Sequence, residues 1–231
     1  MKAVILAGGR GSRLQEVTKG LPKQLAEVAG DVHMKHLLDR LPIEVNELVI
    51  VTGSIGGDLL EKYVQSVKGD RKVTFIRQHE PTGTAHALLL AKDEVINEKS
   101  FVVMYADDLH DTTSIEKLIA YRQAAFVAEV PDPERFGIVE LRDDMTIAGI
   151  EEKPLHPKTN FAVLGMYVFT PRIFDFEPKK GPKGEYFLTS MMEQMIEAGE
   201  RITAVKADKW IPFNDVNDHK IAEQVLLKGS I

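Results

Sequence analysis

Three glycines and two cations follow the first apolar run of the chain, and residues of these types could bind an anion. The run spans residues 3–7, and it leads into Gly8, Gly9, Gly11, Arg13 and Lys23. Glycine lets backbone N–H groups approach a ligand closely, arginine offers several donors to phosphate oxygens, and lysine adds a compact positive charge. The pattern therefore favours a phosphate site at the end of a strand, with a plain tight turn as the alternative.

Two common phosphate-binding signatures do not match this loop. The Walker pattern requires Gly-Lys followed by Ser or Thr, and the chain contains no such run. The dinucleotide pattern Gly-x-Gly-x-x-Gly is met at Gly9 and Gly11, but its third glycine would fall at Leu14. A nicotinamide-dependent enzyme is therefore disfavoured.

Polar side chains also end two later apolar runs. Gln78 ends the run 72–78, and Asp107 and Asp108 end the run 100–108. Carboxylates suit a hard cation such as Mg²⁺. Because successive side chains of a strand point to opposite faces, only one of the two aspartates should face the same site, and either could be the ligand.

The elements that would position these residues alternate between strand and helix. Apolar runs predict strands over 3–7, 47–53, 72–78 and 100–108, and helical spacing predicts helices over 33–41, 56–67, 83–96 and 114–124. This order predicts an α/β fold with an open, doubly wound, mostly parallel sheet of the Rossmann-like kind. Ligands of such sheets bind beyond the carboxyl ends of the strands, where the glycine loop, Gln78 and Asp107 fall.

The second half of the chain has a different pattern. It predicts strands over 126–130, 136–141, 146–154, 160–170 and 202–208, and helices over 186–199 and 218–229. Gly199 is expected to end the first of these helices. We expect a single domain over 1–231, in which the half 126–231 adds a small antiparallel insertion and a closing helix to the half 1–125.

Composition limits the function classes. The chain has 231 residues, 44% of them hydrophobic, and a formal net charge of −6, which gives no basic footprint for nucleic acid or an anionic membrane. It has no cysteine, which excludes disulfides and thiolate chemistry. No window approaches the ~18 apolar residues of a membrane span. We expect a soluble cytoplasmic protein that binds small molecules.

The first motif resembles the signature of a known enzyme family. The runs "LAGGRGSRL" and "LPKQL" are similar to the opening motif of the sugar-1-phosphate nucleotidyltransferases, or NDP-sugar pyrophosphorylases. Later segments are similar to that family in the same order, namely "EPTGTAHAL", "YADDL", "FGIVE", "IEEKP", "NFAVLGMYVF" and "GEYFLTSMM". The resemblance covers nearly the whole chain. Glu16, Ser190 and Asn217 depart from the family pattern, which usually has Pro, Asp and Gly there.

The resemblance implies a Mg²⁺-dependent enzyme. A sugar 1-phosphate would attack the α-phosphorus of a nucleoside triphosphate, and pyrophosphate would leave. Two polyanions must meet, so charge neutralisation and in-line positioning would supply most of the catalysis. The implied catalytic residues are Arg13 on the β- and γ-phosphates, Lys23 on the α-phosphate and Lys153 on the sugar phosphate.

The resemblance also implies binding residues. The nucleotide would contact Leu6, Ala7, Gly8, Gly9, Gly11, Ser12, Arg13, Lys23, Gln78 and Gly83. The sugar phosphate would contact Gly137, Glu152, Lys153 and Val163. Gln78, Gly83, Gly137 and Val163 could instead serve the fold as element ends, turns or core. We expect His86 to be a packed or surface histidine rather than a catalytic one.

Two carboxylates are implied as metal ligands. The family pattern favours Asp107 over Asp108 as the first. Asp215, after Trp210, is the second, and Asp218 is a lesser candidate that could equally cap the last helix through an Asx turn.

The motifs look closest to those of UTP–glucose-1-phosphate uridylyltransferases, so UTP and glucose 1-phosphate are the expected substrates. A dTTP-dependent glucose-1-phosphate thymidylyltransferase is an alternative, because uracil and thymine differ by one methyl group. A cytidylyltransferase for another phosphorylated alcohol and a catalytically silent nucleotide-sugar sensor also stay open. Relatives often form dimers or tetramers, so a homo-oligomer is a further expectation.

Overall fold

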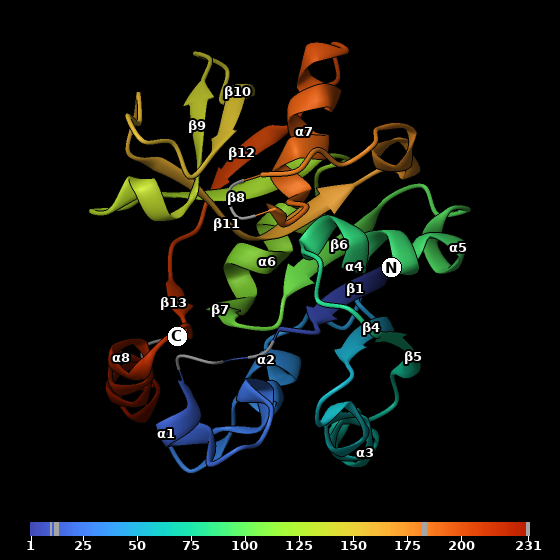
Figure 1. The fold of residues 1–231 in the computed structure, drawn as a ribbon, viewed down its shortest axis with the longest axis vertical. Helices are drawn as coiled ribbons and strands as arrows, with labels where there is room; N and C mark the ends of the chain where they lie inside the picture. Colours follow the sequence, from blue (N-terminus) through green and yellow to red (C-terminus); the bar gives the residue numbers. More distant parts are fainter. Residues whose placement is uncertain (10, 12–13, 182–183, 230–231) are drawn as a thin grey trace. The chain divides into compact units, whose positions relative to one another are not determined.

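The computed structural model of the chain describes residues 1–9, 11, 14–181 and 184–229 (Figure 1). These residues form two compact units, each assembled from separate stretches of chain. The first unit contains Met1–Pro81, Met104–Glu116 and Asp208–Ile231, and the second contains Thr82–Val103 and Lys117–Ala207. The expected halves 1–125 and 126–231 do not coincide with these units, because the C-terminal segment returns to the first.

A parallel sheet forms the core of the first unit. Strand β1 (Lys2–Ala7) pairs with β4 (Glu47–Gly53), which pairs with β5 (Lys72–Gln78). The middle of β1 is fully buried, as expected of a continuous apolar strand covered on both faces. Helices α2 (His33–Asp39) and α3 (Gly57–Val67) come before and after β4. The predicted alternation of strand and helix is therefore confirmed here.

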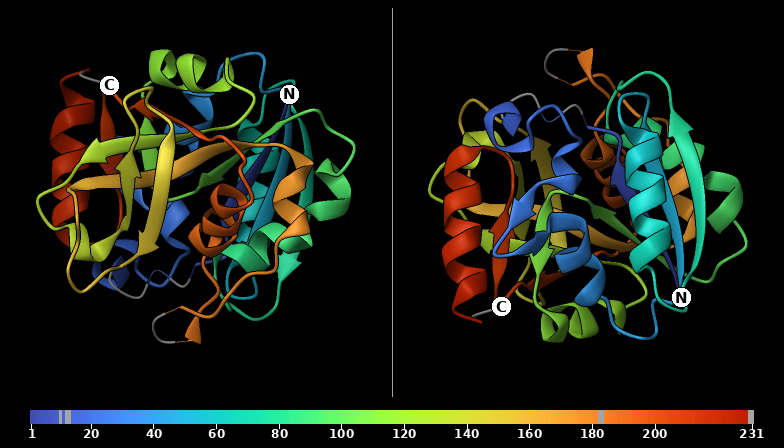
Figure 2. Two further views of the ribbon diagram at one scale, coloured as in Figure 1. Left: turned by 90° about the horizontal axis from the view of Figure 1, so that it is seen from above. Right: turned by 90° about the horizontal axis from the view of Figure 1, so that it is seen from below.

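Short elements complete the first unit. They are α1 (Gln15–Thr18), the 3₁₀ turn η2 (Lys23–Leu25), and the hairpin of β2 (Glu27–Val28) with β3 (Asp31–Val32). Helix α8 (Val216–Leu227) lies beside the segment that contains β2, as Figure 2 shows from below. His219 Nε2 of this helix is 2.8 Å from the Glu27 carbonyl oxygen.

The prediction of one strand over 100–108 is wrong at its end. Strand β6 (Phe101–Tyr105) stops at Tyr105, and the Ala106 N–H donates to the Leu6 carbonyl at 3.1 Å. The chain then turns into β7 (Asp108–His110), which pairs antiparallel with β13 (Trp210–Pro212). Asp107 therefore lies in a turn rather than in a strand.

The second unit contains the predicted antiparallel strands. Strand β9 (Gly137–Leu141) pairs antiparallel with β10 (Ile147–Glu152), and β11 (Phe161–Phe169) pairs antiparallel with β8 (Ala124–Glu129). Strand β12 (Thr203–Lys206) is parallel to β8. The prediction of a small antiparallel insertion is confirmed.

Two helices that follow β5 along the chain are shorter than predicted or interrupted. The expected helix 83–96 is interrupted at Ala91, giving α4 (Thr84–Leu90) and α5 (Lys92–Val95). The expected helix 114–124 is α6 (Thr112–Ile119), because Ala124 already begins β8. Two 3₁₀ turns, η3 (Pro133–Arg135) and η4 (Pro171–Asp175), follow strands. No helix in the described part of the chain is long and apolar enough to cross a bilayer.

Helix α7 (Leu188–Glu197) ends as the sequence predicts. Gly199 has φ 87°, its N–H donates to the Ile196 carbonyl at 3.0 Å, and the Glu200 N–H donates to the Met195 carbonyl at 2.9 Å. These two bonds form a Schellman motif, which favours glycine at this position. The three methionines of α7, Met191, Met192 and Met195, are fully buried and serve as core.

Candidate active site

The glycines after β1 leave room for two polar side chains of the first unit. A Cβ added to Gly8 would lie 2.5 Å from Gln78 Oε1, and one added to Gly11 would lie 3.0 Å from Lys23 Cβ. Gly11 also has φ 60°, where side chains other than glycine are disfavoured. Gln78 and Lys23 are thus brought to the glycine loop, as the sequence predicts. Ser12 and Arg13 lie outside the described residues.

Lys23 and Asp107 form an ion pair, although 84 residues separate them. Their side chains are 11% and 22% exposed, so the pair is largely screened from water. Lys23 is held by η2, and Asp107 by the turn between β6 and β7. The structure therefore places one cation and one carboxylate together next to the glycine loop.

Asp108 takes a different role from Asp107. It is buried, and its Oδ1 accepts a hydrogen bond from Trp210 Nε1 at 2.9 Å. The two aspartates thus have different partners, as expected, although Asp107 lies in a turn and strand alternation is not the reason. Asp107 is therefore the carboxylate available beside Lys23.

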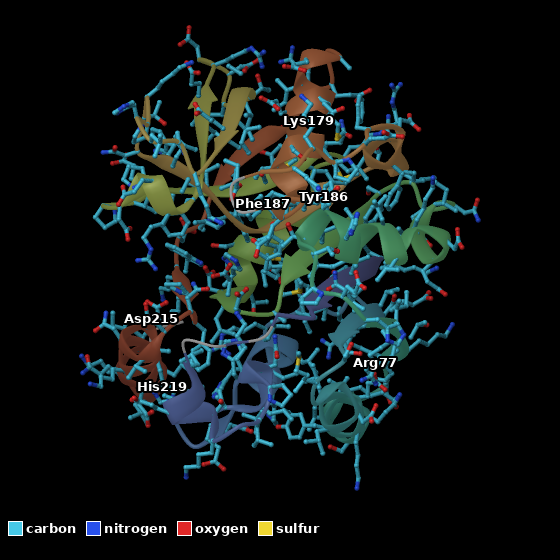
Figure 3. All side chains as sticks on the ribbon, viewed as in Figure 1. Arg77, Lys179, Tyr186, Phe187, Asp215 and His219 are labelled. Atoms are coloured by element: carbon cyan, nitrogen blue, oxygen red, sulfur yellow. The ribbon has the colours of Figure 1, made fainter. Side chains whose placement is uncertain are left out.

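Asp215 caps helix α8 (Figure 3). Its Oδ1 accepts from the Asn217 and Asp218 backbone N–H groups, each at 3.0 Å, and Asp218 Oδ2 accepts from the Asn214 N–H at 2.9 Å. The prediction of a cap at Asp218 is wrong, because α8 begins at Val216 and its cap residue is Asp215. A metal role for Asp215 stays a prediction.

His33, a residue that no sequence motif singled out, lies near this pair. Its ring is fully buried and stacks on Phe213, with 4.2 Å between the centroids. The Phe213 N–H in turn donates to the Asp107 carbonyl at 2.7 Å. Burial, and then the charge of Lys23, lower the pKa of His33 to about 3, so the imidazole is neutral. No local sequence signal links residues 33 and 213.

In the second unit, three predicted sugar-phosphate residues lie together. Glu152 Oε2 accepts from Thr189 Oγ1 at 2.7 Å. A Cβ added to Gly137 would meet Glu152 Oε2 at 3.2 Å and Val163 Cγ2 at 3.1 Å. Thr189 was not among the predicted residues, although it belongs to a segment that resembles the family.

Lys153 follows directly after β10. It has φ 47°, and its N–H donates to the Phe136 carbonyl at 2.9 Å. Its Nζ is 3.3 Å from Glu152 Oε1. The structure thus brings Lys153 to the same group as Glu152, as the sequence predicts.

Gly83 is required by a crossing of two loops. Its φ is 125°, and an added Cβ would lie 2.3 Å from the Tyr186 carbonyl oxygen. Tyr186 is tied to this loop, because its N–H donates to the Thr82 carbonyl at 2.9 Å and its carbonyl accepts from the Ala85 N–H at 3.0 Å. A role of Gly83 at the base stays a prediction. The close approach of the Tyr186 backbone already explains why residue 83 is a glycine, whether or not it contacts a base.

His86 is a packed histidine, as expected. Its ring stacks on Tyr186 with 4.5 Å between centroids, and its Nδ1 is 2.5 Å from Thr82 Oγ1.

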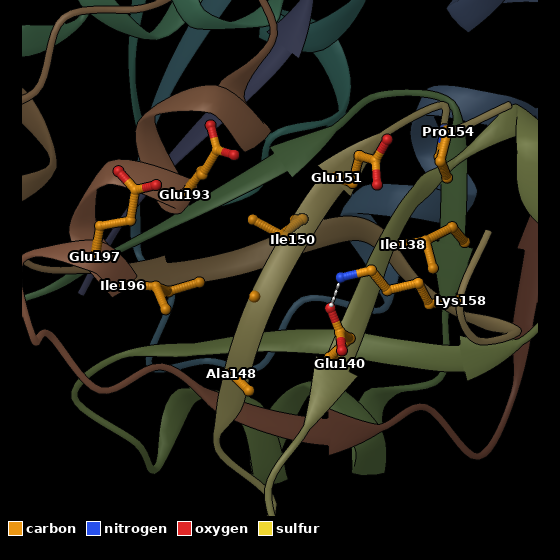
Figure 4. Close-up of a pocket in the computed structure, with 11 residues that line it drawn as sticks. Ile138, Glu140, Ala148, Ile150, Glu151, Pro154, Lys158, Glu193, Ile196 and Glu197 are labelled. Atoms are coloured by element: carbon orange, nitrogen blue, oxygen red, sulfur yellow. Dashed lines mark hydrogen bonds and ion pairs between the residues drawn. The ribbon is translucent and has the colours of Figure 1, made fainter. Parts of the chain in front are cut away.

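A separate pocket of about 350 Å³ lies over β9, β10 and α7 (Figure 4). Its apolar floor includes Ile138 and Ile150, and its rim carries Glu193 and Glu197. Lys158 at the rim pairs with Glu140 at 2.7 Å. The pocket lining contains none of the predicted site residues.

Comparison with known proteins gives a consistent family. A family model described as "Nucleotidyl transferase" matches residues 2–220. The "Bifunctional protein GlmU" of Methanocaldococcus jannaschii is 33% identical over 253 residues, covering 100% of this chain and 60% of that protein. The glucose-1-phosphate thymidylyltransferase of Streptomyces griseus is 32% identical, covering 99% of this chain and 66% of that protein. The chain therefore spans roughly two thirds or less of these relatives.

Another relative is similar in length. The UTP–glucose-1-phosphate uridylyltransferase AglF of Haloferax volcanii is 31% identical, covering 98% of this chain and 96% of that protein. Among solved structures, a Bacillus anthracis protein with bound sucrose has TM-score 0.82 and 26% identity, covering 98% of this chain and 95% of its own. A UDP-glucose pyrophosphorylase in complex with UDP-glucose has TM-score 0.84 and 23% identity, and the match covers 99% of this chain and 98% of that chain. The predicted fold class is confirmed by these structural matches.

Proposed function

The chain belongs to the nucleotidyl transferase family, and we propose that it transfers a nucleotidyl group from a nucleoside triphosphate to a sugar 1-phosphate. An oxygen of the sugar phosphate forms a bond to the α-phosphorus. The bond from that phosphorus to the α,β-bridging oxygen breaks, and pyrophosphate leaves with the electron pair. The attacking phosphate is already ionised at neutral pH, so the step requires no general base.

The observation that carries this proposal is the ion pair of Lys23 with Asp107 beside the glycine loop. A lysine there can neutralise the α-phosphate, and the loop offers backbone donors without intervening side chains. In the second unit, Lys153 beside Glu152 supplies a cation for the sugar phosphate and a carboxylate for its hydroxyls. Both substrates are anions, so positioned cations would lower the barrier.

Mg²⁺ is the cofactor we propose, held by Asp107 and Asp215. Mg²⁺ prefers carboxylate and phosphate oxygens and often takes only one or two protein carboxylates. The support is Asp107, whose partly buried carboxylate lies next to a lysine that could release it to bind a phosphate instead. Asp215 Oδ1 already caps α8, and the described residues contain no group of three or more His, Asp or Glu that could hold a metal, so phosphate oxygens would have to complete the ligand set. When bound, the ion would neutralise charge on the phosphate oxygens.

UTP and glucose 1-phosphate are the proposed substrates. The support is the sequence resemblance together with AglF, the uridylyltransferase relative that matches this chain over nearly its full length. The thymidylyltransferase of Streptomyces griseus supports dTTP as the second candidate. Cytoplasmic location and assembly into a homo-oligomer stay predictions of the sequence.

The reverse reaction tests this function. Wild-type protein with UDP-glucose, pyrophosphate and Mg²⁺ should form UTP and glucose 1-phosphate, detected by chromatography. Lys23→Met should reduce this rate strongly, because an uncompensated phosphate charge remains in the transition state. Lys62→Met, which removes an exposed lysine of α3, should not change it. If neither UDP-glucose nor dTDP-glucose gives a triphosphate, the proposed function is wrong.

A further inference from the structure

An aromatic ring lies against Lys153 in the second unit. Phe187 is labelled in Figure 3. Lys153 Nζ is 4.2 Å from the centroid of its ring. An ammonium group at this distance is attracted by the negative face of the ring. Lys153 Nζ is also 3.3 Å from Glu152 Oε1.

The backbone around this group limits how it can move. Lys153 has a left-handed backbone at φ 47°, a conformation that costs energy for a residue with a side chain and is often found at functional sites. Phe187 is the cap residue of α7, and a Cβ added to Gly181 would come within 2.6 Å of its ring. Glu152 is fixed by its hydrogen bond to Thr189. The end of the lysine side chain, which is 39% exposed, is thus in contact with both a ring and a carboxylate.

We propose that Phe187 positions Lys153 for the phosphate of the sugar substrate. The ring and Glu152 keep the ammonium in one region, so less side-chain freedom is lost when an anion binds. Phe187 acts through Lys153 and is therefore a positioning residue. This inference rests on the proposed function, since it takes Lys153 to bind the sugar phosphate.

The first test needs no activity. In the full chain, the Cε–Hε NMR signal of Lys153, identified by its loss in Lys153→Met, should be shifted upfield by the ring current of Phe187. Phe187→Leu should remove the shift and Phe187→Tyr should keep it, and glucose 1-phosphate should move the signal. A wild-type signal at the ordinary lysine position would overturn the inference, even if the protein proves to be an active transferase.

The second test separates the substrates. Phe187→Leu should raise the KM for the sugar phosphate about two- to five-fold, the range expected from an exposed cation–π pair, and leave kcat and the KM for the triphosphate unchanged. Phe187→Tyr should restore the wild-type KM. Lys206→Met, which removes a similar pair at 5.6 Å from the Phe161 ring, is the matched control and should change neither KM.

A double-mutant cycle completes the test. The affinity for glucose 1-phosphate should fall in Phe187→Leu, but Phe187→Leu should cause no further fall once Lys153 is methionine. Equal effects in both backgrounds, or an equal rise in both KM values, would mean that Phe187 only packs, and would overturn the inference. If no substrate pair releases pyrophosphate, the proposed function fails, and the NMR result still decides separately whether the Phe187 ring holds Lys153.

Discussion

At the residue scale, the clearest case is Asp107. Strand alternation predicts different surroundings for Asp107 and Asp108. Their partners do differ, because Trp210 Nε1 donates to Asp108, but the cause is a turn at Asp107 and not a continuous strand. The direct ion pair of Asp107 with Lys23 could not be predicted. It depends on a turn after Tyr105 and on the placement of η2, and both are set by contacts between distant parts of the chain.

The role of Arg13 rests on sequence alone. Arg13→Ala should lower kcat about 100- to 1,000-fold, because a charged donor to the leaving pyrophosphate is lost. Arg13→Lys should keep part of the rate, because lysine retains the positive charge but lacks the paired N–H donors of the planar guanidinium group. Steady-state kinetics and thermal melts of both variants check this. A normal kcat in a folded Arg13→Ala protein would remove Arg13 from the mechanism.

Buried histidines should make the protein sensitive to mild acid. Burial lowers the pKa of His33 and of His110 to about 3, whereas a histidine in the unfolded chain takes a proton near pH 6.5. The unfolded state therefore binds more protons between these values, and stability falls as the pH drops below 6.5. Each histidine should cost about 2 kcal/mol of unfolding free energy between pH 6.5 and pH 5.

His33→Phe tests that origin, because phenylalanine can still stack on Phe213 but cannot take a proton. Urea unfolding at pH 7 and pH 5 should show a smaller loss of stability in the variant than in the wild type. The same loss in both proteins would mean that His33 does not cause the acid sensitivity.

At the scale of elements, periodicity found the strands and most helices but not where they break. The apolar run 100–108 gives no local sign that β6 ends at Tyr105, because the following residues are drawn into pairing with β13. Ala91 likewise gives no sequence signal for the break between α4 and α5. Gly199, by contrast, is a local signal, and the end of α7 was predicted correctly.

Gly83 offers a stability prediction for the crossing loops. Gly83→Ala should destabilise the protein by more than Gly69→Ala. Both glycines have positive φ, but space around Gly69 is open, whereas an added Cβ at Gly83 meets the Tyr186 backbone. Gly69→Ala should cost about 1–2 kcal/mol from its backbone alone. Chemical unfolding of both variants measures the difference, and equal losses would contradict the close approach at Gly83.

At the scale of the whole molecule, chain order did not reveal the two units. Residues 208–231 return to the first unit after more than 90 residues in the second, and only long-range packing determines this. Most residues assigned to the nucleotide lie in the first unit, and those assigned to the sugar phosphate lie in the second. The predicted site residues rest on the local resemblance of each motif to the family.

Metal removal should stop the proposed reaction. Chelation with EDTA should abolish pyrophosphate release, and added Mg²⁺ should restore it. Asp107→Asn should lower the rate about 100-fold or more even at high Mg²⁺, because the ion would lose a negatively charged carboxylate ligand. Asp70→Asn, which changes an exposed aspartate, is the control and should behave as wild type. Full activity in EDTA would exclude the metal role.

Pyrophosphate release by the wild-type protein tests the central claim most directly. The protein would be mixed with Mg²⁺, each of UTP, dTTP, CTP, GTP and ATP, and several sugar 1-phosphates. We predict release that needs both substrates and is fastest with UTP and glucose 1-phosphate. No release with any pair, while nucleotide sugars still raise the melting temperature, would contradict the transferase and favour a nucleotide-sugar sensor on the same fold.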